Sequence, residues 1–413
     1  MTYNGDLGGL SCTALSCPAR RRKIRLSPHW SAGACARKGP AGRRCLDAHA
    51  YNNGDSLEWS PHPGLRSTEM TPENESSAFH ERYSRQTLFA PIGSEGQRRI
   101  CNAKVAVVGC GAIGASVCTL IARAGIGTLR IIDRDYVEPS NLQRQLLFDE
   151  EDARQSCPKA DAAARKILAS NSEVAVDAHV KDLTPQTTHL LEDVDLILDC
   201  TDNFETRYLI NDFAVKAGGP WIYAAAVGSY AVTMNVLPGE TACLACVFPE
   251  PPRGTFATCE TAGILNSVAN LVASIQVAEA MKFMVGARAA LRRSLMSMDV
   301  WTNERSEIST AKPRPDCNVC GEHRFDYLEG KACPQITLCG RNSVQIHERE
   351  RPVDFNEMSS RLSPHGQVRY NDMVLKFWRE AYEMTLFRDG RAIIKGTTDP
   401  MVARSLYAKF VGS

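Results

Sequence analysis

The chain has 413 residues, which is enough for two ordinary hydrophobic cores or for one large core with additions. Its hydrophobic fraction of 44% and charged fraction of 23% are typical of a soluble globular protein. The formal net charge of +1 gives no support for a nucleic-acid or membrane-surface partner. The longest apolar stretch contains Asn270, Glu279 and Lys282, so it predicts a buried helix rather than a membrane span.

The sixteen cysteines do not suggest a disulfide scaffold, because such scaffolds are short secreted chains. Four of the cysteines form two Cys-x-x-Cys pairs, and several others lie in apolar segments. This distribution favours a reducing cytoplasm with one metal site. The N-terminus has a basic run at 21–24 but no apolar segment of a signal peptide, which also favours a cytoplasmic location.

Residues 1–78 have no sustained periodicity and are rich in Gly, Pro, Ser, Arg and Asn. We expect them to be disordered, or not to belong to the natural product at all. Met70 opens a stretch that would serve as the natural start, which would make residues 1–69 a translation-start artefact. The alternative is that these residues form a targeting or regulatory tail.

From residue 104 the apolar pattern alternates between strands and helices. This alternation predicts an α/β fold with a Rossmann-like, doubly wound, mostly parallel sheet that is covered on both faces. We assign residues 79–330 to this domain. The expected strands cover 104–109, 128–133, 173–180, 195–202, 221–228, 231–239 and 294–302, and the expected helices cover 115–125, 158–170, 205–218 and 261–285, with a short helical stretch before 195.

Residues 331–413 change character and predict a small α+β module without an obvious catalytic cluster. The hairpin expected at 382–396 would turn at Asp389 and Gly390, a pair that is typical of two-residue hairpin loops. Further strands are expected at 343–348 and 371–380, and helices at 354–366 and 399–412.

A glycine-rich turn, VVGCGAIG at 107–114, joins the first strand to its helix. Gly109, Gly111 and Gly114 would let the backbone approach a phosphate at the helix N-terminus. Asp133 ends the next strand, where it can accept hydrogen bonds from ribose hydroxyls. These features suit both NAD and ATP, and alone they favour a dinucleotide.

The residues that follow the second strand favour ATP instead. Ser140, Asn141 and Arg144 would enter the crevice into which a phosphate chain extends. Lys159 would begin a helix near the same crevice. Other interpretations are that Arg144 pairs with a surface acid and that Lys159 is solvated. The presence of both cations near one crevice argues against these two interpretations.

Asp202 and Asn203 end the strand LILDCTDN, at the edge where sheets of this kind bind ligands. An arginine, a lysine and an aspartate in one crevice suit a triphosphate with Mg²⁺, because the cations neutralise phosphate charge and the aspartate holds the metal. A hydride-transfer site has no need for this concentration of charge.

Two Cys-x-x-Cys pairs lie more than seventy residues apart. Four thiolates form the closed tetrahedral ligand set of a structural zinc site, and Zn²⁺ would fix the late segment to the earlier loop. The alternative is that the four are unpaired buried thiols. The four expected zinc ligands are Cys243, Cys246, Cys317 and Cys320.

Cys259 ends a polar, proline-containing loop immediately before the long helix that we expect at 261–285. A helix N-terminus lowers the pKa of a thiol, so the position favours a reactive thiolate. A covalent role and the absence of one both remain open.

Eight motifs, RYSRQ, GCGAIG, D-x-D-x-V-x-x-SNLQRQ, PK, CTDN, CLAC, TCETAG and CNVCG, follow one another over about residues 80–325. In order and spacing they resemble the MoeB/ThiF family, which comprises bacterial activating enzymes for ubiquitin-like sulfur carriers and is related to the adenylating domain of ubiquitin-activating enzymes. The resemblance implies that ATP adenylates the carrier's C-terminal Gly-Gly carboxylate and releases pyrophosphate, for sulfur transfer in cofactor biosynthesis. A separate protein would donate the sulfur.

The resemblance also implies a homodimer in which Arg85 reaches the ATP of the neighbouring subunit. Ala112 departs from the family's usual glycine, and the segment SCPK at 156–159 departs from the usual glycine-bearing form; both changes put ATP affinity in question. Cys259 aligns with a cysteine that bonds to the carrier in ThiF-like members, whereas an adenylate suffices in MoeB-like members. The implied nucleotide contacts are Gly111, Ala112, Asp133, Asn141, Arg144, Lys159, Asp202 and Asn203.

Three alternatives stay open at this point. They are an NAD-dependent oxidoreductase, a relative that adenylates a small molecule or a tRNA base, and a scaffold that has lost turnover. Molybdopterin, thiamine, cysteine and thiolated-tRNA routes all share carrier adenylation, so the motifs do not choose among them. The C-terminal module lacks a rhodanese-like segment and is a candidate docking site for the carrier or the sulfur donor.

Overall fold

The computed structural model of the chain describes residues 81–251, 262–331, 337–338, 343–346, 352–388 and 390–412. Residues 1–78, which we expect to be disordered or mis-assigned, lie outside these ranges, so that expectation stays a prediction. The domain boundaries expected at 78 and 330 stay predictions as well. In the described ranges, no helix combines the length and the apolar character needed to cross a membrane.

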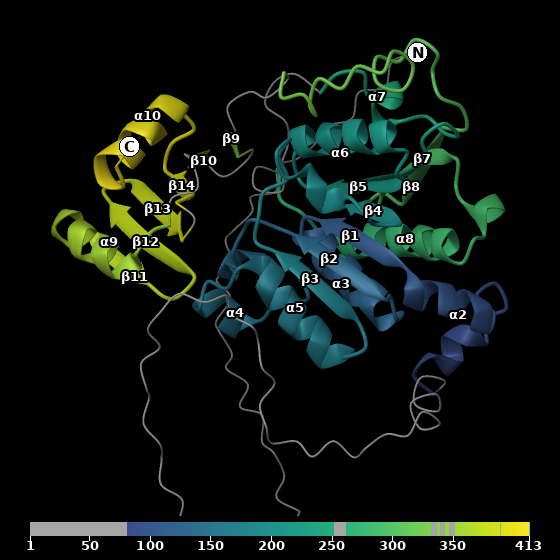
Figure 1. The fold of residues 1–413 in the computed structure, drawn as a ribbon, viewed down its shortest axis with the longest axis horizontal. Coiled ribbons are helices and arrows are strands. Elements are labelled where there is room, and N and C mark those ends of the chain that lie inside the picture. Colours follow the sequence, from purple (N-terminus) through teal and green to yellow (C-terminus); the bar gives the residue numbers. More distant parts are fainter. Residues whose placement is uncertain are drawn as a thin grey trace, which may run out of the picture. The chain divides into compact units, whose positions relative to one another are not determined.

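Eight strands form one large sheet in the order β3-β2-β1-β4-β5-β6-β7-β8 (Figure 1). The first five are parallel and the last three are antiparallel to their neighbours. The expected doubly wound, mostly parallel α/β sheet is therefore confirmed. The strands are β1 Lys104–Val108, β2 Thr128–Ile132, β3 Ala175–His179, β4 Leu196–Asp199, β5 Trp221–Val227, β6 Tyr230–Val236, β7 Ser294–Asp299 and β8 Glu304–Ser309.

Helices cover both faces of the large sheet (Figure 1). Residues of α3, α5 and α8 share one hydrophobic core with one face, while α6, α7 and the 310 helix η2 contribute to the core on the other face. Strand residues between these layers, such as Val105 and Val107, are fully buried, as expected for central parallel strands. The helices are α2 Gly93–Asn102, α3 Ala112–Arg123, α4 Glu150–Arg154, α5 Lys159–Ser170, α6 Phe204–Ala217, α7 Leu244–Val247 and α8 Asn266–Met284, with 310 helices η1 Pro139–Asn141, η2 Thr188–Leu191 and η3 Arg288–Ala290.

Strand β8 and helix α2 are absent from the sequence-based expectation. All six residues of β8 are exposed, because it is the edge strand of the sheet. An edge strand without a buried face has no hydrophobic alternation to detect. Helix α2 buries Ile100, but its other buried residues are Gly96 and Gln97, which give little apolar pattern.

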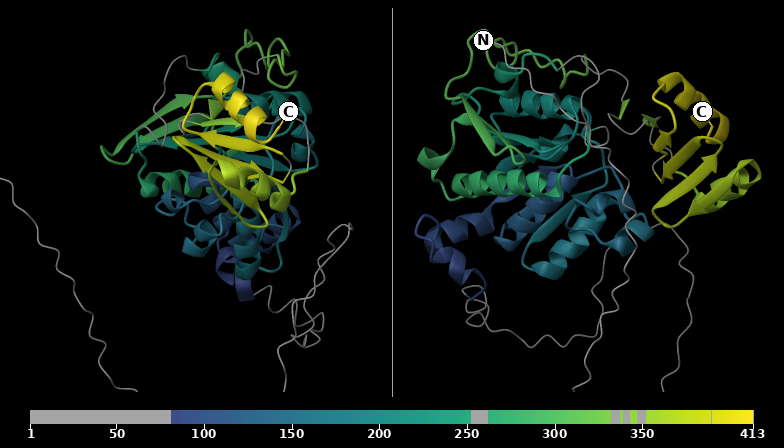
Figure 2. Two further views of the ribbon diagram at one scale, coloured as in Figure 1. Left: turned by 90° about the vertical axis from the view of Figure 1, so that its left-hand side faces the viewer. Right: turned by 180° about the vertical axis from the view of Figure 1, so that it is seen from behind.

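The C-terminal residues form a second, antiparallel sheet in the order β11-β12-β13-β14-β10-β9, with two helices against it (Figure 2). The small α+β module is confirmed, although β9 and β11 were not expected and Asp389 of the expected turn lies outside the described residues. The elements are β9 Thr337–Leu338, β10 Ser343–Ile346, α9 Phe355–Leu362, η4 Ser363–His365, β11 Gln367–Tyr370, β12 Val374–Arg379, β13 Tyr382–Phe387, β14 Ala392–Lys395 and α10 Pro400–Phe410.

Candidate functional site

The glycine turn lies between β1 and α3, and its three glycines serve different purposes. A Cβ atom on Gly109, whose φ is +86°, would lie 2.8 Å from the carbonyl oxygen of Cys200. A Cβ atom on Gly114 would lie 1.9 Å from the carbonyl oxygen of Gly109. At Gly111 a Cβ would approach Nε2 of Gln145 no closer than 3.9 Å, and among the described residues no atom beyond its neighbours in the chain lies nearer. Packing therefore demands the outer two glycines, whereas Gly111 leaves room for a ligand at the start of α3.

Asp133 follows β2 and is held against the glycine turn. Its Oδ2 accepts a hydrogen bond from the backbone N–H of Cys110 at 2.5 Å, and its Oδ1 accepts one from the N–H of Asp135 at 2.7 Å. Burial raises the pKa of the Asp133 carboxyl, and the nearby Lys159 ammonium opposes that rise. The carboxylate thus lies where β1 and β2 end, beside the turn that would hold a phosphate.

Lys159 begins α5 and is buried, with its side chain only 3% exposed. Its Nζ lies 3.1 Å from Oδ2 of Asp135, and its backbone N–H donates to the carbonyl of Asp135 at 2.8 Å. The interpretation of Lys159 as a solvated helix residue is therefore wrong. Asp135 is not among the residues expected from the sequence, although it is the second aspartate of the D-x-D motif.

The segment after β2 forms the 310 helix η1, which fixes Asn141. The side-chain oxygen of Asn141 accepts a hydrogen bond from the N–H of Glu138 at 3.1 Å. In turn, the Glu138 side chain accepts one from the backbone N–H of Asn141 and caps η1. Arg144 donates a hydrogen bond from Nη1 to the carbonyl of Ser140 at 2.8 Å, which is a contact within its own loop. Gln145 is buried beside the glycine turn. Sequence reasoning gave Gln145 no role.

The loop after β4 carries Asp202, and a buried pair beneath it supports the loop. Asp199 accepts hydrogen bonds from the N–H and hydroxyl of Thr201, and its Oδ2 lies 3.6 Å from Nε of Arg207. Arg207 also donates to the carbonyl of Thr201 at 2.6 Å. Burial raises the pKa of Asp199 to about 6. Asp202 is exposed, and Asn203 caps α6 by accepting from the N–H of Thr206 at 2.8 Å.

The structure brings most of the expected residues to one edge, because β2, β1 and β4 are neighbours in the sheet and all end there. Asp202 follows β4, and its negative charge contributes to raising the pKa of both Asp199 and Arg134. Sequence reasoning missed Asp135, Asp199 and Arg207, because each becomes relevant only through contacts that folding creates.

Arg85 lies apart from this group, in a helical stretch at 81–87. Its neighbours are anchored: the Tyr83 hydroxyl receives a hydrogen bond from Asn171 at 2.9 Å, and Gln86 donates to the carbonyl of Ala124 at 2.9 Å. Arg85 itself is exposed. Its position is therefore well fixed while its side chain faces outward.

Cys259 lies outside the described residues, but the helix after it is described. The expected helix start at 261 is wrong, because α8 begins at Asn266. Ile264 pairs with Gly228 in an isolated parallel bridge, and the N–H of Leu265 donates to the carbonyl of Gly228 at 2.8 Å. This bridge, which follows a turn at 262 and Gly263 with a φ of +72°, holds the chain outside the helix until Leu265. α8 therefore starts seven positions after Cys259 in the sequence, and the expected reactivity of Cys259 stays a prediction.

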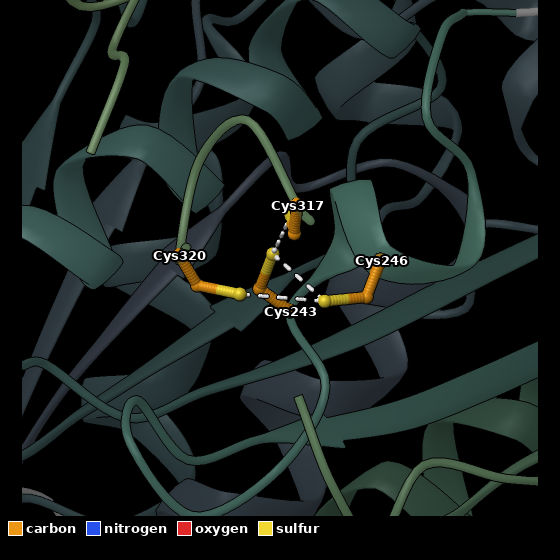
Figure 3. Close-up of side chains that lie close together, drawn as sticks. All are labelled: Cys243, Cys246, Cys317 and Cys320. Carbon is orange, nitrogen blue, oxygen red and sulfur yellow. Dashed lines mark hydrogen bonds between the residues drawn. The ribbon is translucent and has the colours of Figure 1, made fainter. Parts of the chain in front are cut away.

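Cys243, Cys246, Cys317 and Cys320 come together as expected, with their sulfur atoms within 4.8 Å of one another (Figure 3). Three Sγ–Sγ distances are 3.8, 3.6 and 3.3 Å. Zinc–sulfur bonds of about 2.3 Å in a tetrahedron require sulfurs about 3.8 Å apart. The cluster could therefore hold a zinc ion with little movement. It would join the loop at α7 to the loop after β8.

Replacing Cys317 and Cys320 by serine together should abolish zinc binding and lower the free energy of unfolding by at least about 3 kcal/mol, because the ion would no longer join the two loops. Metal analysis of the purified protein and chemical denaturation measure both effects. Cys101→Ser is the matched control, since Cys101 lies outside the cluster. Equal metal content in wild type and double variant would contradict the assignment.

Comparisons with known proteins identify the family. Residues 83–319 match the ThiF family. The chain is 43% identical over 336 residues to the sulfur carrier protein ThiS adenylyltransferase of Bacillus subtilis (strain 168), covering 80% of this chain and 99% of that protein. It is 37% identical over 249 residues to the sulfur carrier protein adenylyltransferase of Thermus thermophilus, covering 59% of this chain and 91% of that protein. A crystal structure of E. coli MccB aligns with a TM-score of 0.53 and 26% identity, covering 59% of this chain and 72% of that one.

The family match spans more than half of the chain, and the Bacillus subtilis relative is matched almost end to end. The glycine turn is therefore that of an adenylyltransferase and not that of an NAD-dependent oxidoreductase. The chain belongs to the ThiF family.

Proposed function

We propose that this chain uses ATP to adenylate the C-terminal Gly-Gly carboxylate of a small ubiquitin-like sulfur-carrier protein. Two relatives are named as adenylyltransferases of sulfur carriers, one of them specifically of ThiS. The match to the ThiS enzyme covers nearly its whole length, which favours a ThiS-like carrier and a role in thiamine biosynthesis. A MoaD-like carrier of the molybdenum cofactor pathway is the next candidate.

The observation that carries this proposal is the set of charges at one edge of the large sheet. Asp133 lies against the glycine turn, and the buried Lys159 lies beside it. Asp202 follows the neighbouring strand. A ribose acceptor, a cation and an exposed carboxylate around a helix N-terminus match the parts of a nucleoside triphosphate with its metal. Arg144 supplies a second cation from the segment after η1.

The reaction needs no protein base, because the carrier's carboxylate is already ionised at neutral pH. One carboxylate oxygen attacks the α-phosphorus of ATP, a P–O bond to it forms, and the bond to the departing pyrophosphate breaks. Lys159 and Arg144 neutralise the charge that accumulates on the phosphate oxygens. Asp202 would hold Mg²⁺, which offsets the charge of the departing pyrophosphate. Catalysis is thus positioning combined with electrostatic stabilisation.

The carrier's tail would reach this edge beside the segment that precedes α8. Gln143 donates from Nε2 to the carbonyl of Ile264 at 3.2 Å, which ties the end of that segment to the loop carrying Arg144. The loop that includes Cys259 joins directly to it in sequence. We propose that this loop crosses over the carrier's tail. The Cys259 thiolate would attack the carbonyl carbon of the acyl-adenylate, forming a thioester and releasing AMP, before a separate protein delivers sulfur.

Replacing Arg144 by alanine and Asp202 by asparagine together should reduce carrier-dependent ATP–pyrophosphate exchange by at least about a thousandfold, because a phosphate cation and the metal ligand are both lost. Circular dichroism and thermal unfolding check that the variant is folded. The matched control replaces Arg324 by alanine and Asp326 by asparagine, an exposed ion pair elsewhere on the chain. Unchanged exchange in the Arg144/Asp202 variant would refute the mechanism.

We propose in addition that the protein acts as a homodimer in which Arg85 completes the nucleotide site of the partner. The exposed Arg85 is followed by Leu88 and Phe89, whose exposed fractions are 72% and 60%. Large apolar side chains so exposed beside a well-anchored helical stretch favour a second protein surface. A second copy of this chain would cover them and bring Arg85 to the other subunit.

Mixing two inactive variants tests this arrangement. Arg85→Ala and Asp202→Asn subunits should each be inactive alone, since each site then lacks one component. After unfolding and refolding together, half of the dimers are mixed and each has one intact site, so exchange should recover to about a quarter of the wild-type rate. No recovery in refolded dimers would show that Arg85 does not act across the interface.

A further inference from the structure

The C-terminal sheet has two buried faces, which is more than its own helices can cover. Side chains alternate between the two faces along each strand. Leu375, Met384 and Ile394 point to the face that shares a core with α9 and α10. Their neighbours Thr385 and Ile393 point the other way, yet they are 0% and 1% exposed. Another part of the chain must therefore bury the second face.

That second face is covered by Tyr136, which follows β2 in the segment that carries the candidate nucleotide site. Tyr136 is 1% exposed and packs in one cluster with Val374, Phe387 and Ile393. Its hydroxyl lies 3.3 Å from Oγ1 of Thr385. The contact therefore joins the antiparallel sheet to a residue that lies three positions after Asp133.

An ion pair extends this contact to the residues of η1. Lys395, on the same face of the sheet as Ile393, contacts Oε1 of Glu138 through its Nζ, and the two side chains are 25% and 18% exposed. Glu138 is also the cap of η1, and its N–H donates to Asn141 at 3.1 Å. A direct series of contacts thus runs from the C-terminal sheet through Glu138 to Asn141.

A buried arginine makes a further contact of the same kind. Arg391, which is 3% exposed, donates to the carbonyl oxygens of Arg134 and Val180 at 3.5 and 3.4 Å. These two carbonyls follow β2 and β3, at the carboxyl edge of the large sheet. The C-terminal module therefore holds the segment after β2 on both sides of Tyr136.

We propose that the C-terminal module is a positioning element of the nucleotide site and that Lys395 is a positioning residue, acting through Glu138 on Asn141 and the segment that leads to Arg144. This inference rests on the proposed function only in placing ATP at that segment. The module holds the loop in its binding conformation before the nucleotide arrives. Without the ion pair, ATP must order the loop as it binds, so affinity falls while the chemical step is retained.

Lys395→Met in the full-length protein tests the proposal. The KM for ATP in pyrophosphate exchange should rise about five- to tenfold, because loss of a half-buried ion pair lowers the affinity for ATP by up to about tenfold. The kcat should stay within about twofold of the wild-type value. Lys395→Arg should restore the wild-type KM, since it keeps the charge. Lys409→Met is the control: Lys409 belongs to the same module and lies over the ring of Phe410 within it.

Glu138→Gln removes the same ion pair from the other side and is the second variant. Its rise in KM should match that of Lys395→Met, and the double variant should show no further rise. Equilibrium binding of a fluorescent ATP analogue supplies a readout that does not require adenylation. A wild-type protein that binds the analogue without exchange would overturn the proposed function alone. An unchanged KM and unchanged analogue affinity in both variants, or an equal loss in Lys409→Met, would overturn the positioning role.

Discussion

The buried ion pair between Lys159 and Asp135 is the interaction on which the candidate site depends. An ammonium taken out of water must be paired, and removing one partner of a buried pair typically costs about 3–5 kcal/mol. An ammonium group has three N–H donors. Asp135 takes up part of this capacity, which leaves a fixed positive group for a phosphate. Asp135 thus holds the charge in place before any ligand binds.

The parallel strand order converts this local pair into a site. Because β2, β1 and β4 lie side by side and end at one edge, Asp133, the glycine turn and the loop of Asp202 meet there. The cysteine cluster and the C-terminal sheet play supporting parts at two other places. The cluster joins two loops that are distant in sequence, and the C-terminal sheet packs on Tyr136. Preorganised charge of this kind suits a reaction whose main requirement is to stabilise the negative charge on the phosphate oxygens.

Hydrophobic periodicity and the ordered motifs were sufficient to predict the parallel sheet and the four-cysteine cluster. Periodicity could not show β8, since an edge strand with six exposed residues carries no apolar signal. It also extended α8 too far toward Cys259, because the bridge between Ile264 and Gly228 depends on a distant strand end. The contacts by which Asp199 supports the Asp202 loop could not be predicted either, since nothing in the local sequence marks an acid in an apolar strand as buried and paired.

Oxygen transfer gives the most direct test of the central claim, that a carrier's terminal carboxylate attacks the α-phosphorus of ATP at this edge. The carrier is labelled with ¹⁸O in its C-terminal carboxylate and incubated with the protein and ATP, and hydroxylamine then cleaves the acyl-adenylate at its carbonyl carbon. Mass spectrometry should find one ¹⁸O atom in the AMP, because the attacking oxygen stays on phosphorus. Unlabelled AMP would mean that water had attacked the nucleotide, and it would contradict the account.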